Sequence, residues 1–349
     1  MDTMTTVRCL LGALVLGTCA SSPADSSSQA LPHGSAAAAA VAFEETGTFS
    51  IVARDPTTGE LGVAVQSKAF AVGSRVPTVK GGLVAMAHQA QSNPMYGALG
   101  VELLRAGMTP QQALDIAVRG DNERDRRQVA MIDSQGRTAA WTGPAAQEWK
   151  GHRCGTDYCA QGNILAGPQV VDAMVRAFES TKGPLAERML AALDAAQSAG
   201  GDVRGAQSAA LVVARPLAGA AGFSDRVVDL RVDDSRAPLV ELRRLLTMLG
   251  ANQLAQESGD RLSKGQPEEA LRLAATATER SPENDVAWLA LARTALAQGD
   301  RARTLEALRR AVDLNPANRR QVAEASVFAP LRGDEAFRAL VDEAGRPRP

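Results

Sequence analysis

Residue 250 separates two parts of the 349-residue chain that differ in hydrophobic periodicity. Before it, short Val- and Ile-rich runs with alternating polar residues are separated by turn residues and by helical patterns. After it, Ala, Leu, Arg and Glu recur at helical spacing without any strand-like run. We therefore expect an α+β domain at 48–250 and an all-α region at 251–349.

The all-α region repeats with a period of 34 residues. In this register Gly265 matches Gly299, and Pro282 matches Pro316. The second copy resembles a tetratricopeptide repeat, in which small residues let two helices pack closely and a Pro ends the second helix. The segment after Pro316 looks like a degenerate third unit, so a small α-solenoid is predicted.

Two interpretations of these repeats stay open. A tetratricopeptide array offers a concave surface that binds a peptide or a partner protein. Two and a half repeats provide little such surface, however. The region therefore fits equally well a packing appendage or a contact between two copies of the chain, as in a homo-oligomer.

Composition excludes several classes of function. The 38 Lys and Arg residues nearly balance the 39 Asp and Glu residues, so no nucleic-acid partner is expected. Aromatic residues make up 3% of the chain, too few for an aromatic-lined carbohydrate groove. The three His residues are dispersed and no nucleotide-binding glycine motif occurs, so we expect no metal and no cofactor.

The segment 1–47 is expected to combine an export signal with a tether. Its apolar run at 9–17 is too short to span a bilayer but suits the core of a secretory signal. Leu16-Gly-Thr-Cys19 resembles a lipoprotein cleavage box, which would put a lipid anchor on Cys19, although Thr18 departs from the usual Gly or Ala. The alternative is ordinary cleavage and soluble release. Both predict an exported protein, in the periplasm or cell envelope or secreted, whose first residues are disordered or removed.

Two cysteines remain outside the signal. Cys154 and Cys159 form a C-x4-C pair in a polar, Gly-containing segment that is expected to be a short loop. In an oxidising compartment we expect a disulfide between them. Two free thiols are the alternative, and a metal pair would need a second Cys/His pair that the sequence lacks.

The order of elements in 48–250 favours two antiparallel sheets between helix layers. Strands at 48–54 and 61–68 form a hairpin across a turn at 55–59. The remaining strands are expected at 76–80, 83–88, 128–133, 137–141, 207–214 and 226–232, and the helices at 93 onward, 109–118, 167–180, 184–198 and 238–249.

A family resemblance rests on four segments: Gly47-Thr-Phe-Ser-Ile-Val-Ala-Arg-Asp-Pro-Thr-Thr-Gly-Glu-Leu-Gly-Val-Ala-Val-Gln-Ser-Lys68, Gln161-Gly-Asn-Ile-Leu-Ala-Gly167, Gln207-Ser-Ala-Ala210 and Val228-Asp-Leu-Arg-Val-Asp-Asp234. They resemble the family catalogued as domain of unknown function 1028. That resemblance implies the N-terminal-nucleophile (Ntn) hydrolase fold, a four-layer αββα sandwich, but no settled substrate. Ser235 stands where the family usually has His, so a site that uses that His would be missing here.

Thr48 is the candidate nucleophile, because it opens the first strand and follows Gly47. A Thr hydroxyl needs a base, and the α-amino group freed by cleavage between Gly47 and Thr48, with an ordinary pKa of roughly 7.7–8.0, can be that base. The Thr48 hydroxyl itself or a protease would break the bond. The alternative is that Thr48 only begins a strand, and that the sandwich is an inactive scaffold for the repeats.

Four further residues are candidates for the site. Lys68 lies at the same end of the hairpin as Thr48, where its cation would lower the proton affinity of the base. Gln89 and Asn93 stand between a strand and a helix N-terminus, a place where side-chain and backbone donors form oxyanion holes, and Asn163 is a second candidate donor. The predicted activity is hydrolysis of an amide bond in a small molecule or peptide.

Overall fold

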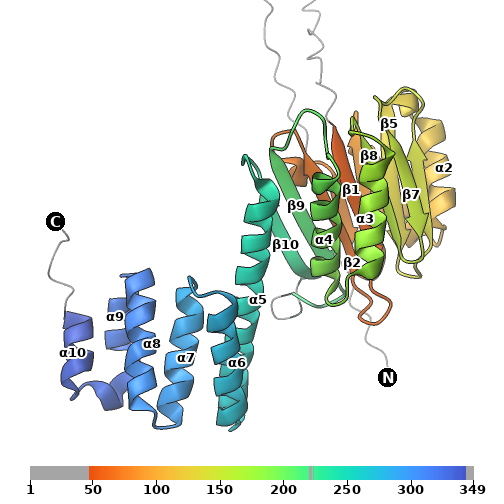
Figure 1. Cartoon of the computed structure of the whole chain (residues 1–349). Coiled ribbons are helices and arrows are strands. Elements are labelled where there is room, and N and C mark those ends of the chain that lie inside the picture. Colours follow the sequence, from red (N-terminus) through yellow and green to blue (C-terminus); the bar gives the residue numbers. More distant parts are fainter. Residues whose placement is uncertain (1–46, 220–221, 223, 343–349) are drawn as a thin grey trace, which may run out of the picture. The chain divides into compact units, whose positions relative to one another are not determined.

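The computed structural model describes residues 47–219, 222 and 224–342 (Figure 1). The expected export signal, the anchor at Cys19 and the tether up to residue 46 lie outside the described residues. Within these ranges no helix is both long and apolar enough to cross a membrane.

Two antiparallel sheets form the centre of the first domain. The larger has the order β10-β9-β2-β1-β8-β7, with β1 at Thr48–Arg54, β2 at Leu61–Ser67, β7 at Gly151–Gly155, β8 at Tyr158–Asn163, β9 at Ser208–Ala214 and β10 at Arg226–Val232. The smaller has the order β3-β4-β5-β6, with β3 at Pro77–Lys80, β4 at Val84–Ala90, β5 at Arg127–Asp133 and β6 at Thr138–Thr142.

Helices cover the outer face of each sheet (Figure 1). The smaller sheet packs against α1 (Met95–Arg105) and α2 (Pro110–Gly120). The larger sheet packs against α3 (Pro168–Ser180), α4 (Leu185–Ser198) and the start of α5 (Pro238–Ser263). Because a third apolar cluster fills the space between the sheets, the domain has four layers. The expected αββα, Ntn-hydrolase-like sandwich is confirmed.

The alternation of β1 decides which of its side chains face the other sheet. Phe49 and Ile51 join the apolar cluster beneath α3 and α4. Val52 joins the cluster between the sheets, and Thr48 and Ser50 share its face because successive strand residues point to opposite sides. The layer between the sheets is therefore apolar around Val52 and polar at the end where Thr48 lies.

Helix α2 shows how capping residues determine where a helix begins. Thr109 precedes it, and its hydroxyl accepts a hydrogen bond from the backbone N–H of Gln112 at 3.3 Å. The Gln112 side chain in turn accepts from the Thr109 N–H at 3.0 Å, which completes a capping box. Pro110 occupies the first helical position, where its missing N–H costs nothing.

The cysteine segment is a strand pair rather than the expected loop. Cys154 in β7 lies opposite Cys159 in β8, and the two form the expected disulfide with their Cα atoms 4.0 Å apart. The polar segment still forms a strand because β7 is an edge strand whose central side chains are exposed. An exposed edge requires no apolar alternation, which is the signal that sequence analysis uses.

The last part of the described chain consists of helix pairs, as the repeat predicts. They are the end of α5 with α6 (Pro267–Arg280), α7 (Asp285–Ala297) with α8 (Arg301–Leu314), and α9 (Asn318–Glu324) with α10 (Glu335–Asp342). Gly265 and Gly299, which match in the repeat, have φ values of 71° and 75°. This left-handed conformation ends the first helix of each pair and favours glycine.

The predicted boundary near residue 250 falls inside a helix. The helix expected to end at residue 249 continues through Gly250 to Ser263 as α5. Its first half contributes Leu242 to the sandwich core, and its second half contributes Ala251 to an apolar cluster of the repeats. Burial on both halves outweighs the roughly 1 kcal/mol that a helical Gly costs, so no break occurs.

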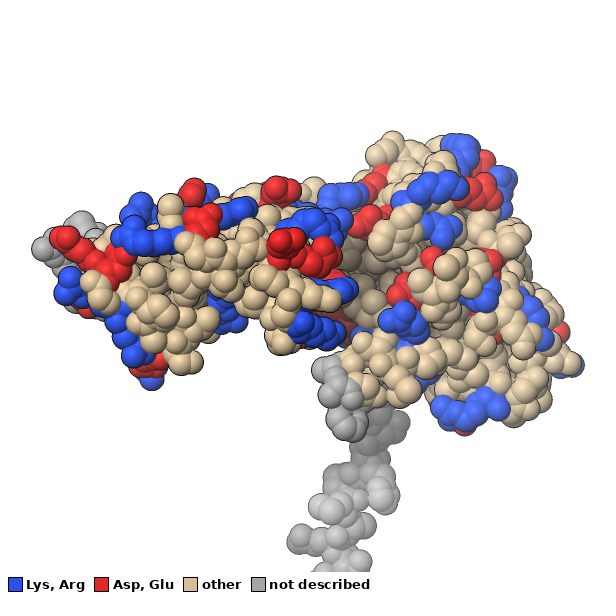
Figure 2. All heavy atoms as spheres, turned by 90° about the horizontal axis from the view of Figure 1, so that it is seen from below, with Lys and Arg blue, Asp and Glu red and all other residues tan. Residues whose placement is uncertain are grey.

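Charged side chains follow the balanced composition. On the face shown in Figure 2, basic and acidic residues of the described chain are interspersed, without a broad area of one sign. On this face the distribution agrees with the net charge of −1.

Candidate active site

Thr48 begins β1 at the polar end of the layer between the sheets, and it is fully buried. Its neighbours across the strands are Ser67, which ends β2, and Asn163, which ends β8. Both neighbours are buried as well. The antiparallel register thus brings two of the predicted residues, Thr48 and Asn163, together at one edge of the larger sheet.

Two hydrogen bonds connect the Thr48 hydroxyl to the peptide bond in front of it. Thr48 Oγ1 donates to Ser67 Oγ at 3.0 Å, and Ser67 Oγ donates to the carbonyl oxygen of Gly47 at 2.6 Å. This carbonyl belongs to the Gly47–Thr48 bond, whose cleavage the sequence suggests. A proton that leaves Thr48 therefore has a continuous path to the Gly47 oxygen.

A second donor to the same oxygen comes from the loop after α4. Arg204 Nη2 donates to the Gly47 carbonyl oxygen at 3.1 Å. Asp202, which is buried, accepts from Arg204 Nη2 at 2.7 Å and from Nε at 3.1 Å, and so fixes the guanidinium. Two donors converging on one carbonyl oxygen are the arrangement of an oxyanion hole.

The same contacts favour glycine at position 47. A Cβ there would lie 2.5 Å from Asp202 Oδ2 and 2.8 Å from Arg204 Nη2, closer than real Cβ contacts. Any larger residue would push the Asp202–Arg204 pair away from the carbonyl. The Gly-Thr sequence thus lets the charged pair approach the bond itself.

Lys68 does not supply the cation beside Thr48. Its side chain is exposed, and its ammonium group makes no hydrogen bond with a residue that the structure describes. Its backbone N–H approaches Asp202 Oδ2 at 3.4 Å, a weak contact. The nearby cation is Arg204, which sequence reasoning missed because it lies in a separate Gly-rich loop. A charged pair between glycines just before a strand was the available signal.

Gln89 reaches Thr48 from the smaller sheet. Its Nε2 donates to the Thr48 carbonyl oxygen at 3.0 Å and to Gln128 Oε1 at 2.9 Å. Its Oε1 accepts from Ser50 Oγ at 2.6 Å. Because both amide hydrogens are used, Gln89 positions Thr48 and leaves no hydrogen for an oxyanion. The residue predicted for the site is present, but in a different role.

Buried glutamines also bridge the two sheets around Thr48. Gln128 Nε2 donates to the carbonyl oxygen of Gly162 at 2.9 Å, and Gln161 Nε2 donates to that of Ala87 at 3.0 Å. Buried amides with satisfied donors hold strands in a unique register. Sequence reasoning did not single out Gln128, because an isolated Gln in a strand carries no periodic signal.

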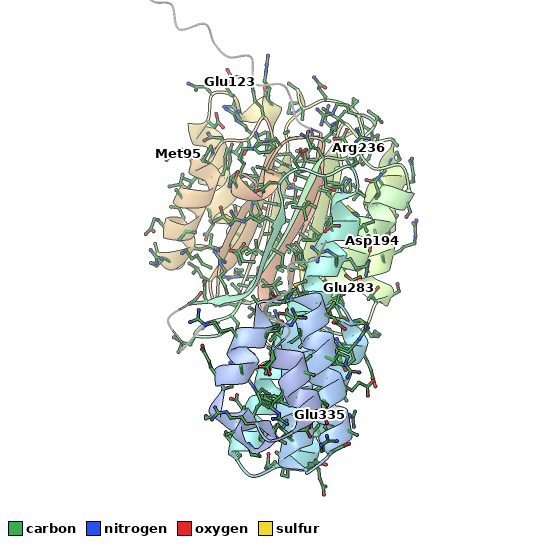
Figure 3. The ribbon with its side chains drawn as sticks, turned by 90° about the vertical axis from the view of Figure 1, so that its left-hand side faces the viewer. Met95, Glu123, Asp194, Arg236, Glu283 and Glu335 are labelled. Carbon is green, nitrogen blue, oxygen red and sulfur yellow. A yellow bond between two sulfur atoms is a disulfide. The ribbon has the colours of Figure 1, made fainter. Side chains whose placement is uncertain are left out.

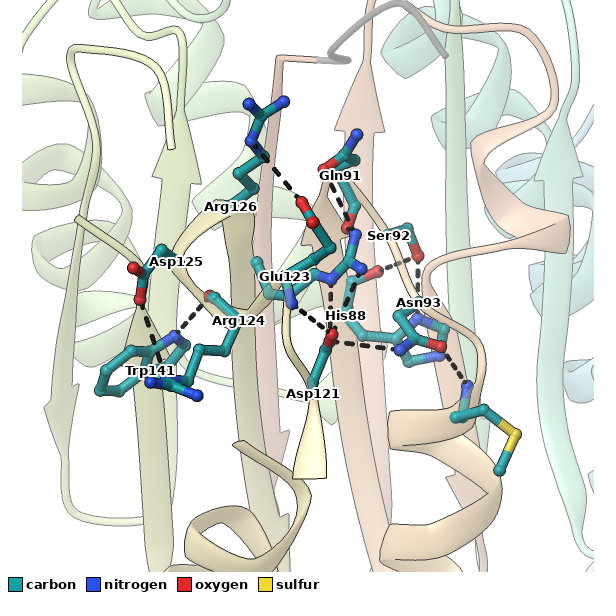
Figure 4. A network of polar contacts seen from close by, with 12 residues as sticks. His88, Gln91, Ser92, Asn93, Asp121, Glu123, Arg124, Asp125, Arg126 and Trp141 are labelled. Atoms are coloured by element: carbon teal, nitrogen blue, oxygen red, sulfur yellow. Dashed lines mark hydrogen bonds and ion pairs between the residues drawn. The ribbon is translucent and has the colours of Figure 1, made fainter. Parts of the chain in front are cut away.

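Asn93 is committed to the start of α1. Its Oδ1 accepts from the Met95 N–H at 3.0 Å, and its Nδ2 donates to Asp121 Oδ2 at 3.2 Å (Figure 4). One Nδ2 hydrogen stays unused within the described residues, but both contacts direct the amide toward Asp121 and the start of α1, and neither joins it to Thr48 or to the Gly47–Thr48 bond. Asn93 instead contributes to the wall of a cavity beside Gln89.

His88 points away from Thr48. It precedes Gln89 in β4, so its side chain lies on the helix-covered face, where Nδ1 is 3.1 Å from Ser92 Oγ and Nε2 is 3.3 Å from Thr78 Oγ1. Burial lowers the pKa of His88 to about 4. The imidazole is therefore neutral at physiological pH and is structural rather than a base for Thr48.

Two residues with strained backbone adjoin the site, and a third precedes η1 (Val72–Ser74). Ala71, Ala90 and Ile164 have φ values of 53°, 63° and 57°. Ala90 directly follows Gln89, and Ile164 directly follows Asn163. The left-handed region costs a non-glycine residue roughly 1–2 kcal/mol. Such strain clusters at functional sites, where the surrounding structure enforces it.

The site offers a single carboxylate, that of Asp202, as a metal-ligand group. Among the described residues, no group of three or more His, Cys, Asp or Glu side chains is placed to hold a metal ion. The groups around Thr48 are hydroxyls, amides and one Asp–Arg pair, a set suited to nucleophilic attack with hydrogen-bond stabilisation of an oxyanion.

Known protein families match each of the two predicted regions separately. The sequence profile described as "Family of unknown function (DUF1028)" matches residues 48–242, and the profile of the tetratricopeptide repeat matches 261–325. A crystal structure of a DUF1028 protein from Silicibacter pomeroyi is 34% identical and aligns with a TM-score of 0.53, over 57% of this chain and 84% of that one. No curated protein matches the chain. Both resemblances inferred from the sequence are confirmed.

Proposed function

The chain belongs to the family of unknown function DUF1028, and we propose that its sandwich is an Ntn hydrolase that acts on an amide bond of a small molecule or peptide. Thr48 is the nucleophile, and it becomes the N-terminal residue by self-cleavage of the Gly47–Thr48 bond. One observation carries the proposal: Ser67 and Arg204 both donate to the Gly47 carbonyl oxygen, while Thr48 donates to Ser67.

Self-cleavage begins with attack of Thr48 Oγ1 on the Gly47 carbonyl carbon. As the C–O bond forms, the hydroxyl proton passes to Ser67, which gives its own proton to the Gly47 oxygen. Arg204 stabilises the partial negative charge that this oxygen carries before the proton arrives. The C–N bond then breaks as the Gly47 carbonyl re-forms, and the proton on the Gly47 oxygen passes to the Thr48 nitrogen. Water hydrolyses the resulting ester to free the Gly47 carboxyl group and the Thr48 hydroxyl.

The mature enzyme then uses the Thr48 amine as its base. With an ordinary pKa of roughly 7.7–8.0, this amine can accept the hydroxyl proton while Thr48 attacks the substrate amide. The amine product leaves, and water hydrolyses the acyl ester on Thr48. Departure of Gly47 frees Ser67 and Arg204 to hold the substrate carbonyl oxygen. Burial of Thr48 in the uncleaved chain explains why cleavage comes first.

We also propose that the protein is exported and that its repeats bind a protein or peptide partner. The disulfide between Cys154 and Cys159 supports export to an oxidising compartment, as the apolar run at 9–17 suggests. Tetratricopeptide repeats generally mediate protein interactions, so the match at 261–325 supports a protein or peptide partner.

Intact mass and N-terminal sequencing of the purified full-length protein test self-cleavage. We expect wild type and Thr48→Ser to yield a chain that begins at residue 48, because Ser keeps the hydroxyl. Thr48→Ala should stay uncleaved at this bond. Thr57→Ala, at an exposed turn of the same hairpin, is the matched control and should cleave normally.

Two outcomes would overturn the proposal. Cleavage of Thr48→Ala at the same bond would assign the step to a protease. A wild-type chain that keeps the Gly47–Thr48 bond when isolated from its native compartment would favour the alternative, an inactive scaffold whose repeats bind a partner.

A further inference from the structure

A cavity of about 610 Å³ lies beside Gln89, the residue whose amide donates to the Thr48 carbonyl oxygen. One side is lined by Val72, Arg75 and Val76, around the 3-10 helix η1 (Val72–Ser74), and the other by residues 89–94 between β4 and α1. This volume suits a metabolite-sized ligand. The cavity is one hydrogen-bonded residue away from the proposed nucleophile.

One of the two arginines in the cavity wall, Arg127, is already paired with a carboxylate. Arg127 Nε donates to Asp121 Oδ2 at 2.9 Å, and its Nη1 donates to the Gln91 carbonyl oxygen at 2.7 Å. Figure 4 shows Asp121 and Gln91 in this network. Burial tends to raise the pKa of Asp121, but hydrogen bonds led by that from Arg127 hold it at about 2. The pair stiffens the wall and adds no net charge.

Arg75 is the cation that remains available to a ligand. Its Nη2 donates to the Phe70 carbonyl oxygen at 2.8 Å, and its side chain makes no ion pair with any residue in the described ranges. A guanidinium has five N–H donors, so most stay free for a ligand. The bond to Phe70 orients the planar fork, which matches the two oxygens of a carboxylate.

The other residues of the cavity wall indicate which kinds of ligand fit. Val72, Val76, Ala90 and Pro94 offer apolar contact to a short carbon chain. Glu123 also lines the cavity, and its carboxylate is only loosely paired, 3.8 Å from Arg126 Nε on the exposed surface. Its negative charge repels a multiply charged phosphate group more strongly than the single charge of a carboxylate.

We propose that this cavity binds the substrate, and that the substrate is a small amide that also carries a carboxylate, held by Arg75. The amide carbonyl reaches Thr48 past Gln89 while the carboxylate stays at Arg75. The identity of the reacting bond rests on the proposed function, whereas binding of the carboxylate does not.

Calorimetric titration of the full-length protein tests the site with simple probes. Succinamate and glutaramate carry one carboxylate and one amide, and succinamide and glutaramide are their neutral counterparts. A charge-assisted bidentate pair should make at least one of the two acids bind about ten- to a hundredfold more tightly than its diamide. Arg75→Gln should remove this difference.

Arg236→Gln is the matched control. Arg236 is also exposed, and Figure 3 places it on the opposite side of the sandwich from Met95 and Glu123. This variant should keep the preference for the acid. Equal binding of acid and diamide, no binding of either acid, or an unchanged preference in Arg75→Gln would each overturn the inference.

The mass measurement of self-cleavage separates this inference from the proposed function, because it needs no ligand. A chain that cleaves itself but ignores carboxylates refutes only the assignment of the cavity. A chain that stays uncleaved but binds glutaramate through Arg75 refutes the hydrolase and leaves the binding site in place.

Discussion

Replacing Ser67 by Ala should slow self-cleavage without disrupting the fold. Ser67 accepts from Thr48 and donates to the Gly47 carbonyl oxygen, so the variant loses both the proton path and one of two donors to the oxyanion. Only the hydroxyl oxygen is removed. The strand pairing of Ser67 with Thr48 on one side and with Ser208 on the other is made by backbone atoms and stays possible.

The expected rate loss follows from these two contacts. Removal of one oxyanion donor costs roughly 10²–10³ in rate, or about 3–4 kcal/mol of activation free energy. Loss of a proton-transfer group alone costs about 10²–10⁴. Because both contacts act in one step, the effects should not multiply, and we expect a slowing of about 10³. Arg204 still holds the Gly47 oxygen and should preserve residual cleavage.

Cell-free synthesis followed by intact mass at intervals measures the rate, because the precursor is seen before it cleaves. Ser208→Ala is the matched control. Ser208 lies opposite Ser67 in β9 and is equally buried, but its hydroxyl bonds to Ala69 and Val72 instead of the scissile bond. The control should therefore lose similar stability and cleave at the wild-type rate. Fast cleavage in Ser67→Ala, or equal slowing in Ser208→Ala, would refute the relay.

Three further predictions concern charge, protonation and covalent restraint. Arg204→Lys keeps a cation for Asp202 but loses the fork that reaches Gly47, so self-cleavage should slow about 10²-fold in the same mass assay, with a melting temperature close to that of wild type. Burial lowers the pKa of His88 from 6.5 to about 4, so the unfolded chain binds this proton first as the pH falls. The stabilisation of the folded state by a neutral His88 is complete above pH 6.5 and is lost toward pH 4. Denaturant titrations should therefore show that the free energy of unfolding falls by about 3 kcal/mol more in wild type than in His88→Gln between pH 7 and 4. Equal losses would contradict a buried neutral His88. Replacing Cys154 and Cys159 together by Ala should lower the free energy of unfolding by about 2 kcal/mol, as expected for a short closed loop, and leave cleavage unchanged; an unchanged denaturation midpoint would argue against the disulfide.

Most of the elements could be predicted from the sequence, because they depend on local patterns. The strand expected at 48–54 is β1, and the helix expected to follow Thr109 is α2. In both cases the pattern of apolar residues or the capping residues is sufficient. The prediction was wrong where the pattern was uninformative, as in the edge strand β7 and in α5, which continues through Gly250.

The site could be predicted only in part. Thr48, Gln89 and Asn163 stand at element ends and do meet, but Asn93 and Lys68 are engaged elsewhere or exposed. Position at the end of a strand predicts the neighbourhood of a side chain. It does not predict which of its hydrogen-bonding groups is already used by another residue.

What the sequence determined by itself is most of the strands and helices, the repeat, and Thr48 after Gly47 at the start of a strand. Only the tertiary structure decided which residues contact the Gly47–Thr48 bond. Ser67 lies 20 residues and Arg204 157 residues from Gly47, yet both donate to its carbonyl oxygen. Hydrophobic periodicity records which face of an element is buried, whereas a hydrogen bond between distant residues depends on strand register and loop packing, which no local pattern encodes.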